Sequence, residues 1–247
     1  MAVSRTILEF GKVKDFGVDV MYGLPGQTES SICASLDSAD YFAPTSIGLL
    51  PLRPTAGTPF YRRVVTNHGR SIKLTHHRNL PTRDEKLACF AAADASLVER
   101  GFAPYTAWHY AKPGYEGLYH RLMQQDIDRI ELGVGGASLT DDLFVRTTSD
   151  LDRYLKKAGD PAATVASVEQ VDAAGRRRLF VRGGLSLSEG LSLAACRERY
   201  GEAPGDEVWG PLVEEGLVTR EDDTVRLTLA GRCFADEALD RAEPALV

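Results

Sequence analysis

The chain has 247 residues and a formal net charge of −6, with 43% hydrophobic and 26% charged residues. This length suits one large domain or two small ones, and the composition is that of a folded globular protein. The acidic balance argues against nucleic-acid binding, which needs clustered Lys and Arg for phosphate contacts. No apolar run reaches the ~20 residues of a membrane-spanning helix. The N-terminus lacks the apolar core of a signal peptide, so we expect a cytoplasmic location.

The first part of the chain predicts alternating helices and strands. Residues 2–13 predict a helix, residues 16–22 a strand ending in a glycine-rich loop, and residues 29–42 a helix capped by Thr28. Residues 45–50 predict a second strand. This order is typical of a parallel sheet whose strands are buried on both faces.

The pattern changes along the rest of the chain. The sequence predicts a Pro/Gly-rich loop at residues 51–59 and a polar surface segment at 66–82. It then predicts an amphipathic helix at 83–100, a third strand at 102–110, a helix at 115–126 and a strand entering a glycine turn at 130–138. From residue 176 the order is helix, helix, two short strands around residues 221–223 and a last helix, which resembles a winged helix. Because residues 201–223 are strongly acidic, we expect a docking or lid module rather than a DNA-binding one.

The four cysteines provide no metal-binding motif. Zinc and iron–sulfur sites usually draw ligands from close pairs or triplets on one loop. The sequence contains no CxxC or CxxxCxxC, and its cysteines lie far apart, at Cys33, Cys89, Cys196 and Cys233. We therefore expect four buried or half-buried thiols and no metal site.

Residues 18–28 carry the most informative pattern. Asp19 lies near the end of an apolar strand, where parallel sheets bind ligands. A carboxylate is costly to bury unless it is hydrogen-bonded. Either a ribose or amino group of a ligand satisfies Asp19, or Asp19 caps a neighbouring backbone amide.

Residues 19–28, DVMYGLPGQT, resemble the DLIYGLPGQT signature of radical S-adenosylmethionine enzymes related to oxygen-independent coproporphyrinogen III oxidase. Other segments resemble that family in the same order, at residues 57–63, 84–85, 101–105, 109–113, 119–121, 132–138, 154, 216–217 and 227–232. The resemblance implies an α/β fold with two domains. Residues 1–140 would form the last part of a partial (β/α) barrel and its extension, and residues 141–247 a helical, winged-helix-like C-terminal domain.

The sequence also departs from this family. The CxxxCxxC motif that holds the family's [4Fe–4S] cluster and its GGGTP strand are absent. Two βα units cannot close a barrel and would leave exposed strand edges. We therefore expect the C-terminal part of a longer protein, a chain completed by a partner, or a decayed relative. Gly48 and Leu50 replace a family Ser and Tyr, and Arg146-Thr147 replace Gln-Asn, so the branch stays open between coproporphyrinogen oxidases, heme chaperones and heme-degrading methyltransferases.

The resemblance implies a place near the cofactor for three residues, and two arginines are candidate substrate contacts. By position, Asp19 and Met21 contact S-adenosylmethionine and Tyr110 lies near it; the alternative for Met21 and Tyr110 is core packing. Arg62 and Arg63 bind porphyrin carboxylates or form a solvated helix start.

His109 and His120 are candidate substrate or heme ligands, because imidazole is a common axial ligand, or they are structural. No catalytic residue is predicted. The complete enzyme would act on a tetrapyrrole by oxidative decarboxylation or methyl transfer, using S-adenosylmethionine and a [4Fe–4S] cluster held by the missing part. This chain alone is expected to be inactive. The alternative is a non-catalytic heme- or tetrapyrrole-binding module or a partner subunit.

Overall fold

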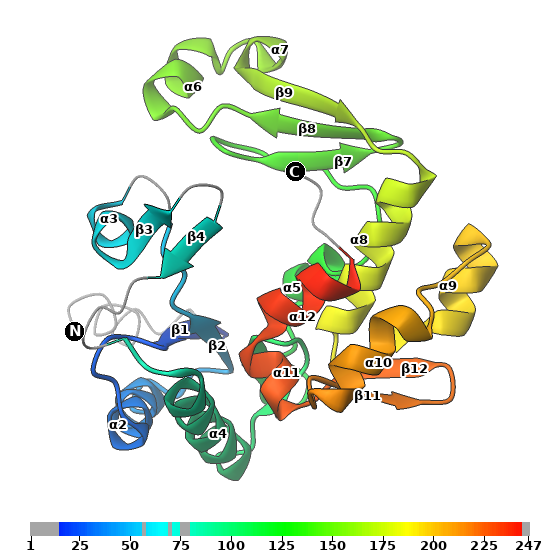
Figure 1. Cartoon of the computed structure of the whole chain (residues 1–247). Helices are drawn as coiled ribbons and strands as arrows, with labels where there is room; N and C mark the ends of the chain where they lie inside the picture. Colours follow the sequence, from blue (N-terminus) through cyan, green and yellow to red (C-terminus); the bar gives the residue numbers. More distant parts are fainter. Residues whose placement is uncertain (1–14, 56–57, 69–70, 75–79, 244–247) are drawn as a thin grey trace. The chain divides into compact units, whose positions relative to one another are not determined.

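The computed structural model describes residues 15–55, 58–68, 71–74 and 80–243, with backbone alone at 62–68 and 71–74, so the helix expected at 2–13 lies outside the described residues. The chain divides into two compact units (Figure 1). The first comprises Met1–Arg121 and Leu227–Ala235, and the second Leu122–Arg226 and Asp236–Val247. The predicted domain boundary at residue 140 falls inside the second unit. The return of Leu227–Ala235 to the first unit is not predicted by the sequence.

The first unit is built on a four-stranded sheet of order β1-β2-β6-β5. The strands β1 (Gly17–Tyr22) and β2 (Ser46–Pro51) run parallel, as the sequence predicts. The single strand predicted at 102–110 is wrong, because the chain forms two short antiparallel strands there, β5 (Ala103–Pro104) and β6 (His109–Ala111). A turn separates them, closed by a 2.9 Å hydrogen bond from the Tyr105 backbone N–H to the His109 carbonyl.

Helices α2 (Glu29–Asp40) and α4 (Arg83–Glu99) cover one face of this sheet. Each begins at a threonine capping box, Thr28 with Ser31 and Thr82 with Glu85, which satisfies free N–H groups of the first turn. Buried residues from the helices and strands form one core, which includes Val20, Tyr22, Ile32, Leu36, Leu49, Phe90 and Leu97. The other face of β1 is exposed, so the expectation that these strands are buried on both faces is wrong for β1.

The segment after β2 is more regular than predicted. It contains helix α3 (Pro59–Val64) and a hairpin of β3 (Val65–His68) and β4 (Ser71–Leu74). The polar pattern of residues 66–82 hid these strands because it gives no apolar alternation.

Helix α11 (Leu229–Cys233) completes the core of the first unit. The Tyr22 hydroxyl donates a 2.7 Å hydrogen bond to the Cys233 carbonyl. Arg232 forms a 2.6 Å ion pair with Asp94 of α4, and it donates a 2.8 Å hydrogen bond to the Tyr110 hydroxyl of β6. This segment is therefore fixed to both the sheet and its covering helix.

The second unit begins within α5 (Leu118–Met123), which is shorter than the helix predicted at 115–126. An antiparallel sheet follows, with β7 (Ala137–Thr140), β8 (Leu143–Thr147) and β9 (Val165–Gln170), and with helices α6 (Leu151–Lys157) and α7 (Pro161–Thr164) between β8 and β9. The strand predicted at 130–138 starts only at Ala137. The cause is the turn before it, in which Gly133 and Gly135 have φ values of 105° and 72°.

The rest of the second unit is helical with a small sheet of order β10-β12-β11. Its elements are α8 (Ala173–Ser186), β10 (Leu191–Ser192), α9 (Leu193–Tyr200), α10 (Asp206–Glu214), β11 (Val218–Glu221), β12 (Thr224–Leu227) and α12 (Ala235–Ala242). Its core includes Val181, Leu185, Leu191, Trp209, Leu212 and Val225. None of the helices in the described ranges combines the length and apolarity that a bilayer span needs.

Candidate functional site

The uncovered face of β1 carries two of the predicted cofactor-binding residues. Side chains alternate along a strand, so Val20 and Tyr22 enter the core while Asp19 and Met21 lie on the opposite face. Asp19 is exposed and Met21 is 45% exposed, which is unusual for an apolar residue in a parallel strand. The structure thus brings Asp19 and Met21 together on an accessible surface.

A row of three paired residues crosses the sheet on this face. Asp19 lies opposite Gly48, and Gly48 lies opposite His109. A Cβ atom on Gly48 would lie 2.2 Å from the Asp19 Oδ1 atom and 3.7 Å from the His109 Cδ2 atom. The glycine therefore leaves the space that the Asp19 carboxylate occupies. Among the described residues this carboxylate has no hydrogen-bond or ion-pair partner, so a capped backbone amide does not explain it.

His109 and His120 lie together at the end of this row. Their rings stack with centroids 3.8 Å apart and an angle of 27° between the planes. Burial, assisted by the neighbouring His120, lowers the pKa of His109 from 6.5 to about 4, so its ring is neutral at pH 7. Gly117 makes room for the stack, because a Cβ there would lie 2.9 Å from the His120 Cδ2 atom and 3.0 Å from the Tyr105 hydroxyl.

Tyr110 is not on this face. It follows His109 directly, so its side chain enters the helix-covered core, where it is fully buried. Its hydroxyl donates a 2.6 Å hydrogen bond to Asp94 and accepts one from Arg232. Burial raises the pKa of Tyr110 far above its usual value. The packing alternative describes this residue, and the structure does not bring it to Asp19 and Met21.

The remaining predicted site residues, Arg62 and Arg63, lie in α3. Their side chains are outside the described part of the structure, so their contact with porphyrin carboxylates stays a prediction. Thr106, which contacts His109, was missed by the sequence reasoning. The three-residue spacing between them, typical of a threonine that binds backbone N–H groups in a turn, is the signal that could have identified it.

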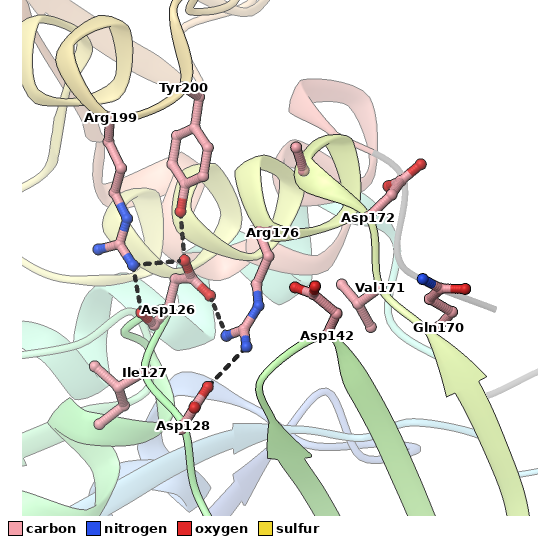
Figure 2. Close-up of a pocket in the computed structure, with 11 residues that line it drawn as sticks. Asp126, Ile127, Asp128, Asp142, Gln170, Val171, Asp172, Arg176, Arg199 and Tyr200 are labelled. Atoms are coloured by element: carbon pink, nitrogen blue, oxygen red, sulfur yellow. Dashed lines mark hydrogen bonds and ion pairs between the residues drawn. The ribbon is translucent and has the colours of Figure 1, made fainter.

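The second unit contains a different polar cluster, around a pocket of about 770 Å³ that none of the predicted residues lines (Figure 2). At its centre is Asp126, whose side chain is only 1% exposed. Its carboxylate forms ion pairs with Arg176 at 2.9 Å and Arg199 at 3.0 Å, and it accepts a hydrogen bond from the Tyr200 hydroxyl. Arg176 also pairs with Asp128 at 2.7 Å. Both carboxylate oxygens of Asp126 are engaged, so this cluster holds α8 and α9 to the chain before β7.

The cysteines do not form a metal centre. Cys89, Cys196 and Cys233 are buried and Cys33 is partly buried, and all four are free thiols, as predicted. In the ranges that the structure describes, no three His, Cys, Asp or Glu residues are grouped so that they could hold a metal ion.

No protein-family profile matches the chain. The oxygen-independent coproporphyrinogen III oxidase of Escherichia coli strain K12 is 22% identical over 242 residues, which are 87% of this chain and 49% of the oxidase. The heme chaperone HemW of Buchnera aphidicola is 31% identical over 103 residues, 42% of this chain and 24% of the chaperone. This chain therefore spans about half the length of the oxidase, and the matched part of the chaperone is shorter.

The fold is also similar to a solved structure. The structure of coproporphyrinogen III oxidase from Escherichia coli, described as a radical S-adenosylmethionine enzyme, matches with a TM-score of 0.71 and 19% identity, covering 98% of this chain and 57% of that chain. The mixed α/β fold of this chain is therefore that of part of the oxidase. The chain is therefore homologous to oxygen-independent coproporphyrinogen III oxidase and to the heme chaperone HemW, and its fold is that of part of a radical S-adenosylmethionine enzyme.

Proposed function

We propose that this chain forms the part of a radical S-adenosylmethionine protein that holds S-adenosylmethionine beside a tetrapyrrole, and that it works with polypeptide that supplies the iron–sulfur cluster. The observation that carries this proposal is the uncovered face of β1, which presents Asp19 and Met21 to solvent in a region homologous to the oxidase. The exposed Asp19 carboxylate is available to accept hydrogen bonds from a ligand, and a ligand that covers the Met21 side chain would remove its apolar surface from water.

The residues on this face suit an adenosyl group. Asp19 provides two oxygens that accept hydrogen bonds from hydroxyl or amino groups. Met21, two residues along the same strand, offers a flexible apolar surface against which a base or sulfonium methyl can pack. When bound, S-adenosylmethionine would supply an adenosyl radical or a methyl group to the substrate. The part played by this chain is to bind and orient that cofactor.

The residues of this chain do not fit an iron–sulfur cluster. Within the described residues no ligand set of three is available, and the sequence has no CxxxCxxC. We therefore assign the cluster to polypeptide outside this sequence, joined to it or on a partner, and expect the isolated chain to be inactive. After incubation with iron and sulfide, the chain should show no stoichiometric cluster absorbance, and a stoichiometric cluster would contradict this assignment.

A tetrapyrrole substrate is inferred from the relatives, which are a coproporphyrinogen III oxidase and a heme chaperone. Arg62 and Arg63 of α3 are offered as guanidinium partners for its carboxylates. The α8, α9 and α10 helices with the β10-β12-β11 sheet follow the order of a winged helix.

The cofactor site is tested by titrating the chain with S-adenosylmethionine in a calorimeter. We expect saturable binding that weakens at least tenfold in Asp19→Asn, because the amide replaces one acceptor with a donor and removes the charge. Asp84→Asn is the matched control, since Asp84 is an exposed aspartate of the same unit in the first turn of α4. Absence of binding, or equal loss in both variants, would contradict the proposal.

Heme binding without catalysis is the second candidate function. His120, whose ring stacks on that of His109, and the similarity to a heme chaperone favour it, with His120 as the candidate heme ligand. A heme titration followed by the Soret absorbance tests it, with His120→Ala expected to change the spectrum and His109→Ala as the comparison variant. Unchanged spectra on mixing heme with the unaltered chain would exclude it.

A further inference from the structure

The geometry points to Thr106 as a positioning residue that fixes His109 as a hydrogen-bond donor through Nε2, so that His109 and Asp19 present one donor and one acceptor side by side on the uncovered sheet face. The same bond leaves His109 without a lone pair for a metal. The ligand part of this inference rests on the proposed function, whereas the state of the imidazole can be measured without any ligand.

The Thr106 hydroxyl is left with only its proton to offer to His109. Thr106 is fully buried. Its Oγ1 accepts hydrogen bonds from the backbone N–H of Trp108 at 3.2 Å and of His109 at 3.1 Å. A hydroxyl oxygen has two acceptor lone pairs and one proton, so its acceptor capacity is filled. It lies 2.9 Å from the His109 Nδ1 atom and must donate there, because no other acceptor is found for it among the described residues.

The second step is the tautomer that this bond requires. An Nδ1 atom that accepts a hydrogen bond carries no hydrogen itself, so the neutral ring bears its hydrogen on Nε2. The low pKa of His109, about 4, keeps the ring neutral at pH 7. This arrangement is the reverse of most metal-binding histidines, whose second nitrogen donates a hydrogen bond to a neighbouring acceptor. His109 therefore has one lone pair engaged by Thr106 and no other.

The third step is where the Nε2 edge lies. Nδ1 faces Thr106, and Cδ2, which is bonded to Nε2, lies 3.7 Å from the position of a Cβ on Gly48. The Asp19 Oδ1 atom lies 2.2 Å from that same position. Neither the Asp19 carboxylate nor the His109 Nε2 atom has a protein partner in the described ranges. Both are therefore left for solvent or a ligand.

The class of ligand follows from this pair. A free carboxylate would be repelled by Asp19, and a metal ion would find no lone pair on His109. A neutral edge that carries a donor beside an acceptor, as in the amino-pyrimidine part of adenine, satisfies both groups at once. Gly48 between them has no side chain, so such an edge can approach the backbone closely.

The experiment is two-dimensional ¹H–¹⁵N correlation of the imidazole nitrogens in the full chain. It compares the unaltered protein with Thr106→Val, which has nearly the same shape without the hydroxyl, and Thr106→Ser, which keeps the hydroxyl. We expect the unaltered protein and Thr106→Ser to show the Nε2–H tautomer at His109, and Thr106→Val to show a tautomer mixture. Assignment uses the loss of the signals in His109→Gln.

The imidazole signals of His109 decide which tautomer is present. An Nδ1–H tautomer in the unaltered protein, or unchanged signals in Thr106→Val, would overturn the inference. If Thr106→Val fails to fold, the unaltered protein and Thr106→Ser still decide it. In the S-adenosylmethionine titration Thr106→Val should bind about fivefold more weakly, the effect of one net hydrogen bond, and Thr106→Ser should bind normally. If the unaltered chain does not bind this cofactor, the proposed function fails while the tautomer result stands.

Discussion

Two aspartates of this molecule, Asp126 in the second unit and Asp19 in the first, have opposite surroundings. The Asp126 side chain is 1% exposed and is bound by two guanidinium groups and a phenol hydroxyl. Asp19 is exposed on a strand and has no partner among the described residues. A buried carboxylate must be satisfied by its own protein, whereas an exposed one beside an uncovered sheet face is available to a ligand. Asp126 therefore stabilises the fold, whereas Asp19 is available to bind a ligand.

The largest expected effect is at Asp126. In Asp126→Ala the partly buried Arg176 and the Tyr200 hydroxyl lose the acceptor that they share, and breaking a cluster around a buried carboxylate costs about 3–5 kcal/mol of unfolding free energy. Urea denaturation measures this loss. Asp142→Ala, at an exposed aspartate lining the same pocket, is the control and should change the unfolding free energy by less than ~0.5 kcal/mol. Similar values for the two variants would show that Asp126 stabilises the fold no more than an exposed aspartate does.

The next effect is at Asp94, which receives both Arg232 and Tyr110. We expect Asp94→Ala to cost about 2–3 kcal/mol, because Arg232, with a side chain 13% exposed, would lose its counter-charge. Tyr110→Phe removes one hydroxyl and keeps the ring, so about 1 kcal/mol is expected. Thermal unfolding of both variants measures the order. An equal or larger cost for Tyr110→Phe would show that the ion pair is not the stabilising contact.

A smaller effect concerns pH. The pKa of His109 is lowered from 6.5 to about 4 in the folded chain, so the unfolded chain binds the extra proton first as the pH falls. This contribution to stability is fully present above about pH 6.5 and is lost toward pH 4. Solvent screening of the partly exposed ring limits it to on the order of 1–2 kcal/mol.

Urea denaturation at about pH 7.5 and about pH 4.5 checks this, comparing the unaltered chain with His109→Gln. The unaltered chain should lose more stability than the variant over this interval. His120→Gln should lose less than the unaltered chain, because its charge is one of the two causes of the lowered His109 pKa. Parallel pH profiles for all three proteins would refute the shift.

The smallest stability effect is expected at Asp19. Asp19→Asn removes no contact among the described residues, so the unfolding free energy should change by less than ~0.5 kcal/mol. The same variant should lose S-adenosylmethionine binding. A large loss of stability would show that Asp19 is part of the fold in the same way as Asp126.

Much of the fold could be predicted from local signals. Thr28 and Thr82 cap their helices, and the parallel pairing of β1 with β2 follows from the βα order. The turn at 105–108 could not be predicted, because it depends on hydrogen bonds of Tyr105 and Thr106 to His109 rather than on an apolar pattern. The return of α11 to the first unit depends on Arg232 meeting Asp94, 138 residues apart in sequence.

The resemblance named Asp19 and Met21, and their contact with S-adenosylmethionine stays a prediction. The structure places both residues on one face of β1, because side chains alternate along a strand with a period of two. The same alternation places Tyr110 on the opposite face, because Tyr110 directly follows His109. The resemblance compares positions in the sequence and does not take this alternation into account. Gly48 was noticed as a departure from the family, but its role depends on the neighbouring Asp19 carboxylate, which only the pairing of β1 and β2 reveals.

The short segment Leu227–Ala235 limits which truncations and rearrangements of the gene leave a folded unit. The chain passes from one unit to the other at residues 121, 226 and 235, so no single cut separates the two units intact. A stop codon before residue 227 would remove Arg232 and Cys233 from the core around Tyr22 and Phe90. A gene rearrangement that kept the sheet of the first unit but lost α11 would therefore leave that sheet incompletely packed. We expect the two units to be retained or lost together in evolution.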